Sequence, residues 1–320
     1  SLAKDGNYTL TGFVGSEGTG ITVTGTGTYT DKNAAADKAV TFGGLTLTGP
    51  GAGNYSLSTT TLTTTGDIAK RALTLEGTAG TQFTKTYDGN ATVTQNLARG
   101  TNYRLAGVVE GEGTNIVALN ESAAQGAYAT KDAQAAGMRQ NVTFTNLALT
   151  GSGAGNYTIA PIMTIANAGV ITPKALTFAL ISGVHLDKVY DGSDNVTHTL
   201  VRDTDYTLNG FVGSEGTGII LDVGAGKYAD KNVGVDKVVT FSGRTLTGSG
   251  AENYTITPVT TVGTITPRPL MPGLVGSFDK TYDGNANVTQ ALALGTNYQL
   301  MGSIAGDALA LTGTGTYADK

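Results

Sequence analysis

The residues best suited to chemistry recur in one short motif, Lys-x-Tyr-Asp-Gly. It occupies residues 85–89, 188–192 and 280–284, at intervals of 103 and then 92 residues. Its members are Lys85, Tyr87, Asp88, Gly89, Lys188, Tyr190, Asp191, Gly192, Lys280, Tyr282, Asp283 and Gly284. Asp-Gly favours a tight turn, because aspartate tolerates positive φ and glycine adopts it freely. The motif therefore predicts a strand that runs into a turn, with a lysine and a carboxylate close to it.

A second acidic position lies nine residues after an Asn-Tyr or Asp-Tyr step, always in a glycine-rich bend. It is occupied by Glu17, Glu112, Glu215 and Asp307. Calcium binds several oxygen ligands supplied by loops. The candidate calcium ligands are Asp88, Glu112, Asp191 and Glu215. The bend lacks the Asp-x-Asp spacing of a strong calcium loop, and a hairpin tip kept soluble by its charge is the simpler interpretation. We therefore expect no metal and no cofactor, with calcium as the alternative.

The recurring lysines allow a covalent alternative as well. Lys85, Lys188 or Lys280 and the asparagine of an Asn-Tyr step could join in an intramolecular isopeptide bond. Such a bond releases ammonia, so an intact mass equal to that of the plain sequence would exclude it.

Enzymatic chemistry has little support in the sequence. Both histidines, His185 and His198, lie in the same repeat, and cysteine is absent. There is no Gly-x-Ser-x-Gly motif and no histidine spacing typical of a metal site. We expect a protein that is not an enzyme.

The intervals between the motifs are long enough for one whole domain per repeat. The sequence predicts a partial repeat at residues 1–70, complete repeats at 71–173 and 174–267, and a partial repeat at 268–320. Pro173 and Pro267 mark strand starts at joints with almost no linker, since proline cannot donate to a β-ladder. We expect a stiff array of repeats, of which this chain is a window.

Local patterns predict an all-β fold. No stretch sustains a 3.6-residue period, and turn signals follow about every ten residues. We expect eight or nine strands in the second repeat and, in each repeat of about 95–100 residues, an antiparallel Ig-like β-sandwich, with a β-grasp fold as the alternative. Val40 and Phe42 share one strand parity while Leu45 and Leu47 share the other, which predicts a bulge near Gly43-Gly44.

All fourteen tyrosines lie at four repeat positions. Aromatic residues placed identically in every repeat are most simply parts of a core, with the hydroxyl at its rim. Exposed aromatic faces on a glycan-binding platform are the alternative.

Composition excludes several classes of partner. The net charge is −5 and 14% of residues are charged, so no basic surface is available for nucleic acid. Apolar runs are short, and neither a membrane-spanning segment nor a secretion signal lies within the chain. Absent cysteines rule out disulfides and suit a protein that crosses membranes unfolded.

Four ordered motifs together resemble a known type of repeat. They are Lys-x-Tyr-Asp-Gly, Tyr-Ala-Asp-Lys-Asn-Val-Gly at 228–234, Leu-Thr-Gly-x-Gly-Ala-Gly-Asn-Tyr-Thr-Ile at 149–159 and Ile-Thr-Pro-Lys-Ala-Leu at 171–176. This set is similar to the YDG-type repeats of filamentous-haemagglutinin-like adhesins, which are very large exported surface proteins of Gram-negative bacteria. The second repeat departs from the pattern with Lys131-Asp132 in reversed order.

The resemblance implies an extracellular or cell-surface location and a structural or adhesive role. We therefore expect a non-enzymatic stalk or fibre segment of an adhesin or extracellular matrix filament, of the kind found in biofilms. Its expected partners are neighbouring repeats, like chains in a fibre and surface glycans. A glycan-binding array and an accessory region of a secreted enzyme are the alternatives.

Overall fold

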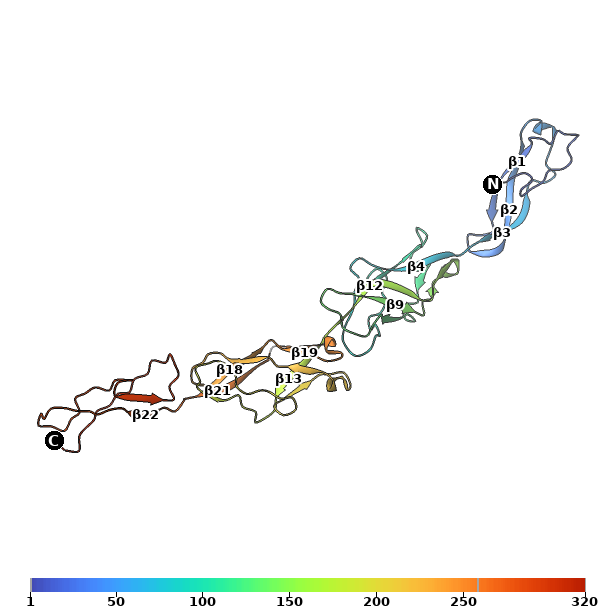
Figure 1. Ribbon diagram of the computed structural model, residues 1–320. Coiled ribbons are helices and arrows are strands. Elements are labelled where there is room, and N and C mark those ends of the chain that lie inside the picture. Colours follow the sequence, from blue (N-terminus) through green and yellow to red (C-terminus); the bar gives the residue numbers. More distant parts are fainter. Residues whose placement is uncertain (1, 258, 320) are drawn as a thin grey trace. The chain divides into compact units, whose positions relative to one another are not determined.

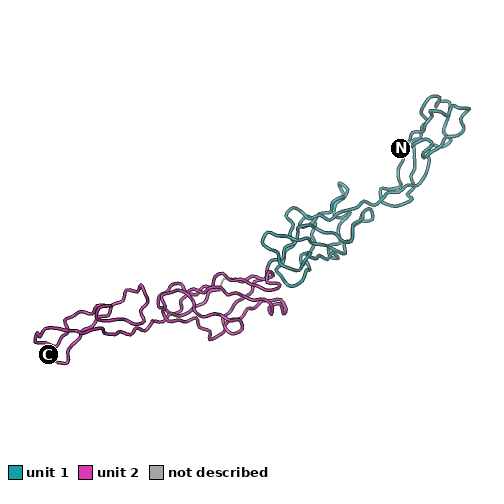
Figure 2. The backbone as a smooth tube through the Cα atoms, in the orientation of Figure 1, with its two compact units in different colours: residues 1–172 teal, residues 173–320 magenta. Residues whose placement is uncertain are grey.

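The computed structural model describes residues 2–257 and 259–319, so Lys320, at the end of a recurring Tyr-x-Asp-Lys motif, lies outside the described residues. The chain forms two compact units, residues 1–172 and 173–320 (Figure 2). The regular elements are short strands and a few single-turn 3₁₀ helices (Figure 1). The predicted all-β class is confirmed. Within the described residues, no helix has the length and apolar character needed to span a membrane.

The second repeat contains nine strands and one 3₁₀ turn, in line with the expected eight or nine strands. They are β4 (Arg71–Gly77), β5 (Phe83–Thr86), β6 (Tyr103–Ala106), β7 (Ala118–Leu119), β8 (Gln125–Tyr128), β9 (Gln140–Thr145), β10 (Leu149–Thr150), η2 (Ala154–Asn156), β11 (Tyr157–Ile159) and β12 (Met163–Thr172). Two sheets carry most of them, in the orders β5-β12-β9-β8 and β11-β4-β6, and β7 pairs with β10 separately.

The sheets are mixed, whereas the sequence predicted antiparallel pairing throughout. Antiparallel pairs dominate, but β5 runs parallel to β12 and β4 runs parallel to β11. Each parallel pair joins a strand from the start of the repeat to one from its end. Turn signals identify only strands that a hairpin connects, and parallel neighbours need a long crossover instead. The local pattern therefore could not reveal these pairs.

The core of the second repeat lies between its two sheets. Leu73 and Leu75 of β4 are buried on one side, and Leu75 N–H lies 3.4 Å from Met163 Sδ of β12 on the other. The rings of Phe83 and Phe144 meet edge to face, with centroids 5.1 Å apart. Strand β5, which contains the start of the Lys-x-Tyr-Asp-Gly motif, thus contributes a core side chain that is fully buried.

The third repeat has the same topology. Its elements are β13 (Lys174–Leu180), β14 (Lys188–Val189), β15 (Tyr206–Asn209), η3 (Glu215–Thr217), β16 (Ile220–Asp222), β17 (Ala225–Tyr228), β18 (Gly234–Ser242), β19 (Thr245–Thr247), η4 (Ala251–Asn253), β20 (Tyr254–Ile256) and β21 (Val259–Thr266). The sheet orders are β14-β21-β18-β17 and β15-β13-β20. The parallel pairs β14–β21 and β13–β20 again join first strands to last strands.

The first and fourth repeats have fewer strands. The first has β1 (Thr22–Tyr29), β2 (Ala35–Thr48), η1 (Ala52–Asn54) and β3 (Leu62–Ile68) in the sheet order β1-β2-β3. The β1–β2 register shifts where Thr24 opposes Thr46 and Thr26 opposes Gly43, which confirms the predicted bulge. The fourth has β22 (Met271–Leu274) paired with β23 (Tyr298–Met301).

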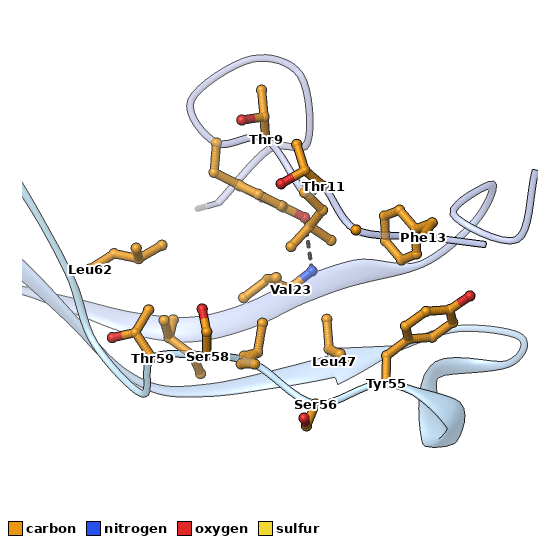
Figure 3. A pocket seen from close by; sticks show the side chains of 15 residues that line it. Thr9, Thr11, Phe13, Val23, Leu47, Tyr55, Ser56, Ser58, Thr59 and Leu62 are labelled. Carbon is orange, nitrogen blue, oxygen red and sulfur yellow. Dashed lines mark hydrogen bonds between the residues drawn. The ribbon is translucent and has the colours of Figure 1, made fainter. Parts of the chain in front are cut away.

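A cavity of about 400 Å³ lies in the first repeat. Figure 3 shows Thr9 and Thr11 on one segment and Tyr55 and Ser58 on another, with Val23 between them in this view. In sequence these two segments correspond to β6 and β11 of the second repeat, and there β4 pairs with both. The cavity thus occupies the place of a β4-like strand. Its lining includes no histidine and no charged side chain.

Candidate functional site

The Lys-x-Tyr-Asp-Gly motif forms a turn closed by its own lysine, which we call the lysine-capped turn. Lys85 Nζ donates to Asp88 Oδ1 at 2.6 Å, to the Asn90 carbonyl at 2.7 Å and to Asn90 Oδ1 at 3.0 Å. Asp88 Oδ1 also accepts from the Asn90 backbone N–H at 3.2 Å. Gly89 has φ 82°, a conformation that strongly favours glycine. The predicted strand and turn are therefore correct here.

The later repeats build the same turn. Lys188 Nζ donates to Asp191 Oδ1 at 2.7 Å and to the Ser193 carbonyl at 2.9 Å. In the fourth repeat the matching bonds run from Lys280 to Asp283 Oδ1 and to the Asn285 carbonyl, both at 2.8 Å. The glycines at 192 and 284 both have φ 79°. Three copies with the same geometry identify the lysine as a structural cap.

The lysine is far more buried than its aspartate. Exposure of the lysine side chain is 6% in the second repeat and 4% in the third, while Asp191 keeps about a third of its side-chain surface. The hydrogen bond from Lys188 lowers the pKa of Asp191 to about 2, helped by bonds from Ser193. Partial burial acts to raise the pKa of Asp88, but the bond from Lys85 holds it below its usual value. Both aspartates therefore stay charged at neutral pH.

An aromatic ring covers each capping lysine. Lys85 Nζ lies 5.5 Å from the centroid of the Tyr128 ring, Lys188 lies 5.5 Å from that of Tyr228, and Lys280 lies 5.4 Å from that of Tyr317. At this range a cation is attracted to the face of the ring. Burial raises the pKa of Tyr128 to about 12, so this phenol is neutral. The capping lysine thereby links the covering tyrosine to the lysine-capped turn.

The glycine-rich bends form a second device, a carboxylate loop braced by a phenol. Tyr157 OH donates to Glu112 Oε2 at 2.6 Å, and the Val109 N–H donates to the same phenol oxygen at 3.2 Å. Tyr254 and Glu215 repeat the bond at 2.5 Å, and Tyr55 donates to Glu17. Burial and the adjacent carboxylate raise the pKa of Tyr157. The charge at the hairpin tip therefore serves to brace the loop as well.

The four candidate calcium ligands have other partners. Asp88 and Asp191 bind a lysine ammonium, while Glu112 and Glu215 accept from a phenol. Across residues 2–257 and 259–319, no group of three or more Asp, Glu, His or Cys side chains could hold a metal ion. The structure thus brings no calcium cluster together in these ranges, and calcium binding stays an untested hypothesis.

The capping lysines bind within their own turns, and so does the asparagine of an Asn-Tyr step. Asn102, for example, accepts from the Ala98 N–H at 2.9 Å and donates to the Asn96 carbonyl at 2.9 Å, within its own turn. The predicted lysine–asparagine pairing therefore has no geometric support there. His185 and His198 are exposed, and His198 Nε2 lies 3.3 Å from Asp205 Oδ1.

The tyrosines of the motif differ widely in exposure. Tyr87 is 2% exposed, Tyr190 is half-buried and Tyr282 is 77% exposed. The prediction that this position is a core position is confirmed for Tyr87 and is wrong for Tyr282. The Tyr87 and Tyr190 N–H groups donate to the Thr172 and Thr266 carbonyls on the last strand of their own repeats, whereas among the described residues no such strand pairs with the turn that contains Tyr282.

Sequence reasoning missed the residue that completes each lysine-capped turn. Asn90, Ser193 and Asn285 lie two positions after the aspartate, and each supplies a carbonyl and a side-chain oxygen to the ammonium. The signal was present as Asp-Gly-Asn or Asp-Gly-Ser. Both residue types favour turns through side-chain hydrogen bonds.

Comparison with known proteins gives one match. The sequence model of the YDG domain matches residues 2–62, 69–164, 172–261 and 266–320. No curated protein and no solved structure matches the chain.

Proposed function

The chain belongs to the YDG domain family, and we propose that it is a non-enzymatic stalk segment of an exported bacterial adhesin or extracellular fibre. One observation carries the proposal: the recurring charged and aromatic residues are engaged in structural contacts. The capping lysines bind their own turn, and the loop carboxylates of the first three repeats bind a tyrosine of the same repeat.

The most distinctive side chains of the repeat make contacts that stabilise the repeat itself. Few reactive groups therefore remain to act on a substrate. Each lysine ammonium already has an aspartate, a carbonyl and an aromatic ring as partners. Proteins that must act as spacers need domains that hold their shape independently and connect without long linkers. In this chain Thr172 ends β12 and Lys174 begins β13, with Pro173 between them. This short connection supports a spacer role.

The adhesin part of the proposal rests on the resemblance to filamentous-haemagglutinin-like proteins and on the absence of cysteine. In this role the repeats would stand end to end at the cell surface or outside the cell, and like chains would be their partners in a fibre. Small-angle scattering of the full chain tests the spacer role: we expect a maximum dimension far above that of a globule of equal mass. A compact globular profile would overturn it. Antibody labelling of intact and lysed source cells tests the location, and labelling confined to lysed cells would contradict it.

A glycan-binding array is the second candidate, and the exposed ring of Tyr282 is the observation that favours it. Aromatic faces stack on sugar rings in many binding sites. Glycan-array screening of the chain and of Tyr282→Ala would distinguish the two functions, because a stalk should bind no glycan in either form.

A further inference from the structure

The two recurring devices lie on different parts of a repeat and can meet a neighbouring repeat. We use "turn end" for the lysine-capped turn together with the Asp-Lys-Asn turn that follows the covering tyrosine. We use "loop end" for the carboxylate loop together with the Gly-Asn-Tyr turn, which the phenol joins to it. The turn end is held together by the capping lysine, and the loop end by the phenol–carboxylate bond.

In the unit of residues 173–320, the turn end of the third repeat contacts the loop end of the fourth. Tyr190 OH donates to Asp307 Oδ1 at 3.0 Å. A Cβ added to Gly192 would lie only 2.8 Å from Ile304 Cγ2, so the fourth repeat packs directly on the turn glycine. Asp307 is the acidic residue of the carboxylate loop. The tyrosine and glycine of the motif are thus used between repeats.

In the unit of residues 1–172, the first and second repeats meet with the same polarity. Lys32 Nζ lies 3.6 Å from Glu112 Oε1, and the Ala34 N–H donates to Asn156 Oδ1 at 2.8 Å. Asn156 Nδ2 donates in return to Asn33 Oδ1 at 3.2 Å. Residues 32–34 belong to the turn end of the first repeat, while Glu112 and Asn156 belong to the loop end of the second.

We propose that the recurring motifs are the two complementary halves of a joint between repeats, and that the turn end is a docking surface for the loop end of the next YDG repeat. The first joint shows the contacts of the Asp-Lys-Asn turn, and the second shows those of the lysine-capped turn. The loop carboxylate is the common acceptor, because Glu112 and Asp307 hold the same repeat position and both receive a group from the preceding repeat.

The two carboxylate oxygens of Glu112 have different partners, which supports this assignment. Its Oε2 accepts from Tyr157 of the same repeat, while its Oε1 faces Lys32 of the preceding repeat. One oxygen therefore braces the loop and the other is available to the neighbour. A hydrogen bond to a charged acceptor is stronger than one between neutral groups and is directional. The Tyr190–Asp307 bond of the second joint can thus orient two repeats, while the exposed Lys32 ammonium at 3.6 Å adds a weaker ionic attraction to the first joint.

Tyr190, which has a loop end bound to it and the last strand of its own repeat beside it, is half-buried. Tyr282 has neither neighbour among the described residues and is 77% exposed. Gly284, unlike Gly192, has no atom within 4 Å of its added Cβ. The occupant of this surface in the third repeat is a YDG carboxylate loop, and the fourth repeat presents the same residue types to such a loop. Such a joint would form whether or not the chain is an adhesin stalk, so failure of either proposal leaves the other standing.

The test uses the full chain, whose lack of cysteine allows site-specific labelling. Dyes on Val235→Cys and Met301→Cys, both exposed positions, report the distance between the third and fourth repeats by single-molecule energy transfer. We expect a narrow distribution that Tyr190→Phe and Asp307→Asn each broaden. Amide exchange in β23 should become about tenfold faster, as the loss of one charge-assisted bond predicts.

Tyr282→Phe is the matched control, since it makes the same change where no loop end is bound, and it should alter neither readout. Tyr190→Phe keeps its ring, so the repeat should fold, which circular dichroism would verify. Unchanged distributions together with unchanged exchange in both joint variants would overturn the proposal. The same design tests the first joint, with Asn156→Ala as the variant and Asn54→Ala, at the equivalent exposed position of the first repeat, as the control.

Discussion

The first and second repeats share their sequence motifs but differ in how well their sheets are covered. Tyr29 is 43% exposed, whereas Tyr128 at the same position of the second repeat is 4% exposed. Phe42 is half-buried, while its counterpart Phe144 is 1% exposed and packs on Phe83. The strand pairing around these residues is the same in the two repeats. Strand β1 is antiparallel to β2 in the first repeat, and β8 is antiparallel to β9 in the second.

The difference comes from two strands. The second repeat begins with β4 and β5, and β5 pairs along β12. In the first repeat, β3 corresponds to β12, and among the described residues no strand pairs with its outer edge. The cavity of Figure 3 lies where a strand equivalent to β4 would run. The comparison shows that the motif strand covers the core of its repeat.

The largest expected effect comes from giving the first repeat these strands. A chain with residues 71–95 placed directly before Ser1 keeps the spacing found in the second repeat. Burial of the two leucines and the phenylalanine of that segment should stabilise the first repeat by about 5 kcal/mol, at roughly 1.5–3 kcal/mol per side chain. Slower amide exchange of β3 would measure it. A prefix with serine at those three positions is the control, and equal protection by both prefixes would refute the explanation.

The next effect concerns the tyrosine of the motif itself. Tyr87→Ala should destabilise the second repeat by roughly 3 kcal/mol, because it removes a large buried aromatic side chain. Tyr282→Ala, at the exposed counterpart, should change stability by no more than about 0.5 kcal/mol. Denaturant unfolding of both variants provides the measurement. Equal losses in the free energy of unfolding for the two variants would contradict the conclusion that burial of the tyrosine determines its contribution.

A smaller, pH-dependent effect belongs to the lysine-capped turn of the third repeat. The folded pKa of Asp191 is about 2, below the unfolded value of 3.8, so the stabilisation is fully present above about pH 4 and is lost as the pH falls towards about 2. Asp191→Asn should cost about 1 kcal/mol at about pH 6, after allowance for solvent screening, and almost nothing at about pH 2. Urea unfolding across this range measures the difference. Asp203→Asn, which alters a highly exposed aspartate, is the control, and a cost independent of pH would disprove the assignment.

No effect at all is expected from calcium in any repeat. Lysine ammonium and phenol groups already occupy the carboxylates of the second and third repeats. Thermal unfolding with added calcium and with a chelator should give the same midpoint. A rise of several degrees with calcium would instead restore Asp88, Glu112, Asp191 and Glu215 as ligands.

Much of this architecture could be predicted from local sequence patterns. The Asp-Gly turn after Tyr87 and the bulge near Gly43-Gly44 follow from conformational preferences that act over a few residues. The parallel pairing of β5 with β12 could not be predicted, because hydrophobic periodicity identifies a strand and its buried face but does not identify a partner 86 residues away, as Gly169 is from Phe83.

The sequence by itself determined the repeat, the all-β class and the order of the motifs along the chain. The tertiary structure decided what each motif contacts. Lys85 and Asp88 are three residues apart, so their bond is local, and a lysine near a turn aspartate could be inferred from the sequence. Tyr190 and Asp307 are 117 residues apart and lie in different repeats. Their contact depends on how two folded domains pack, which no local pattern encodes.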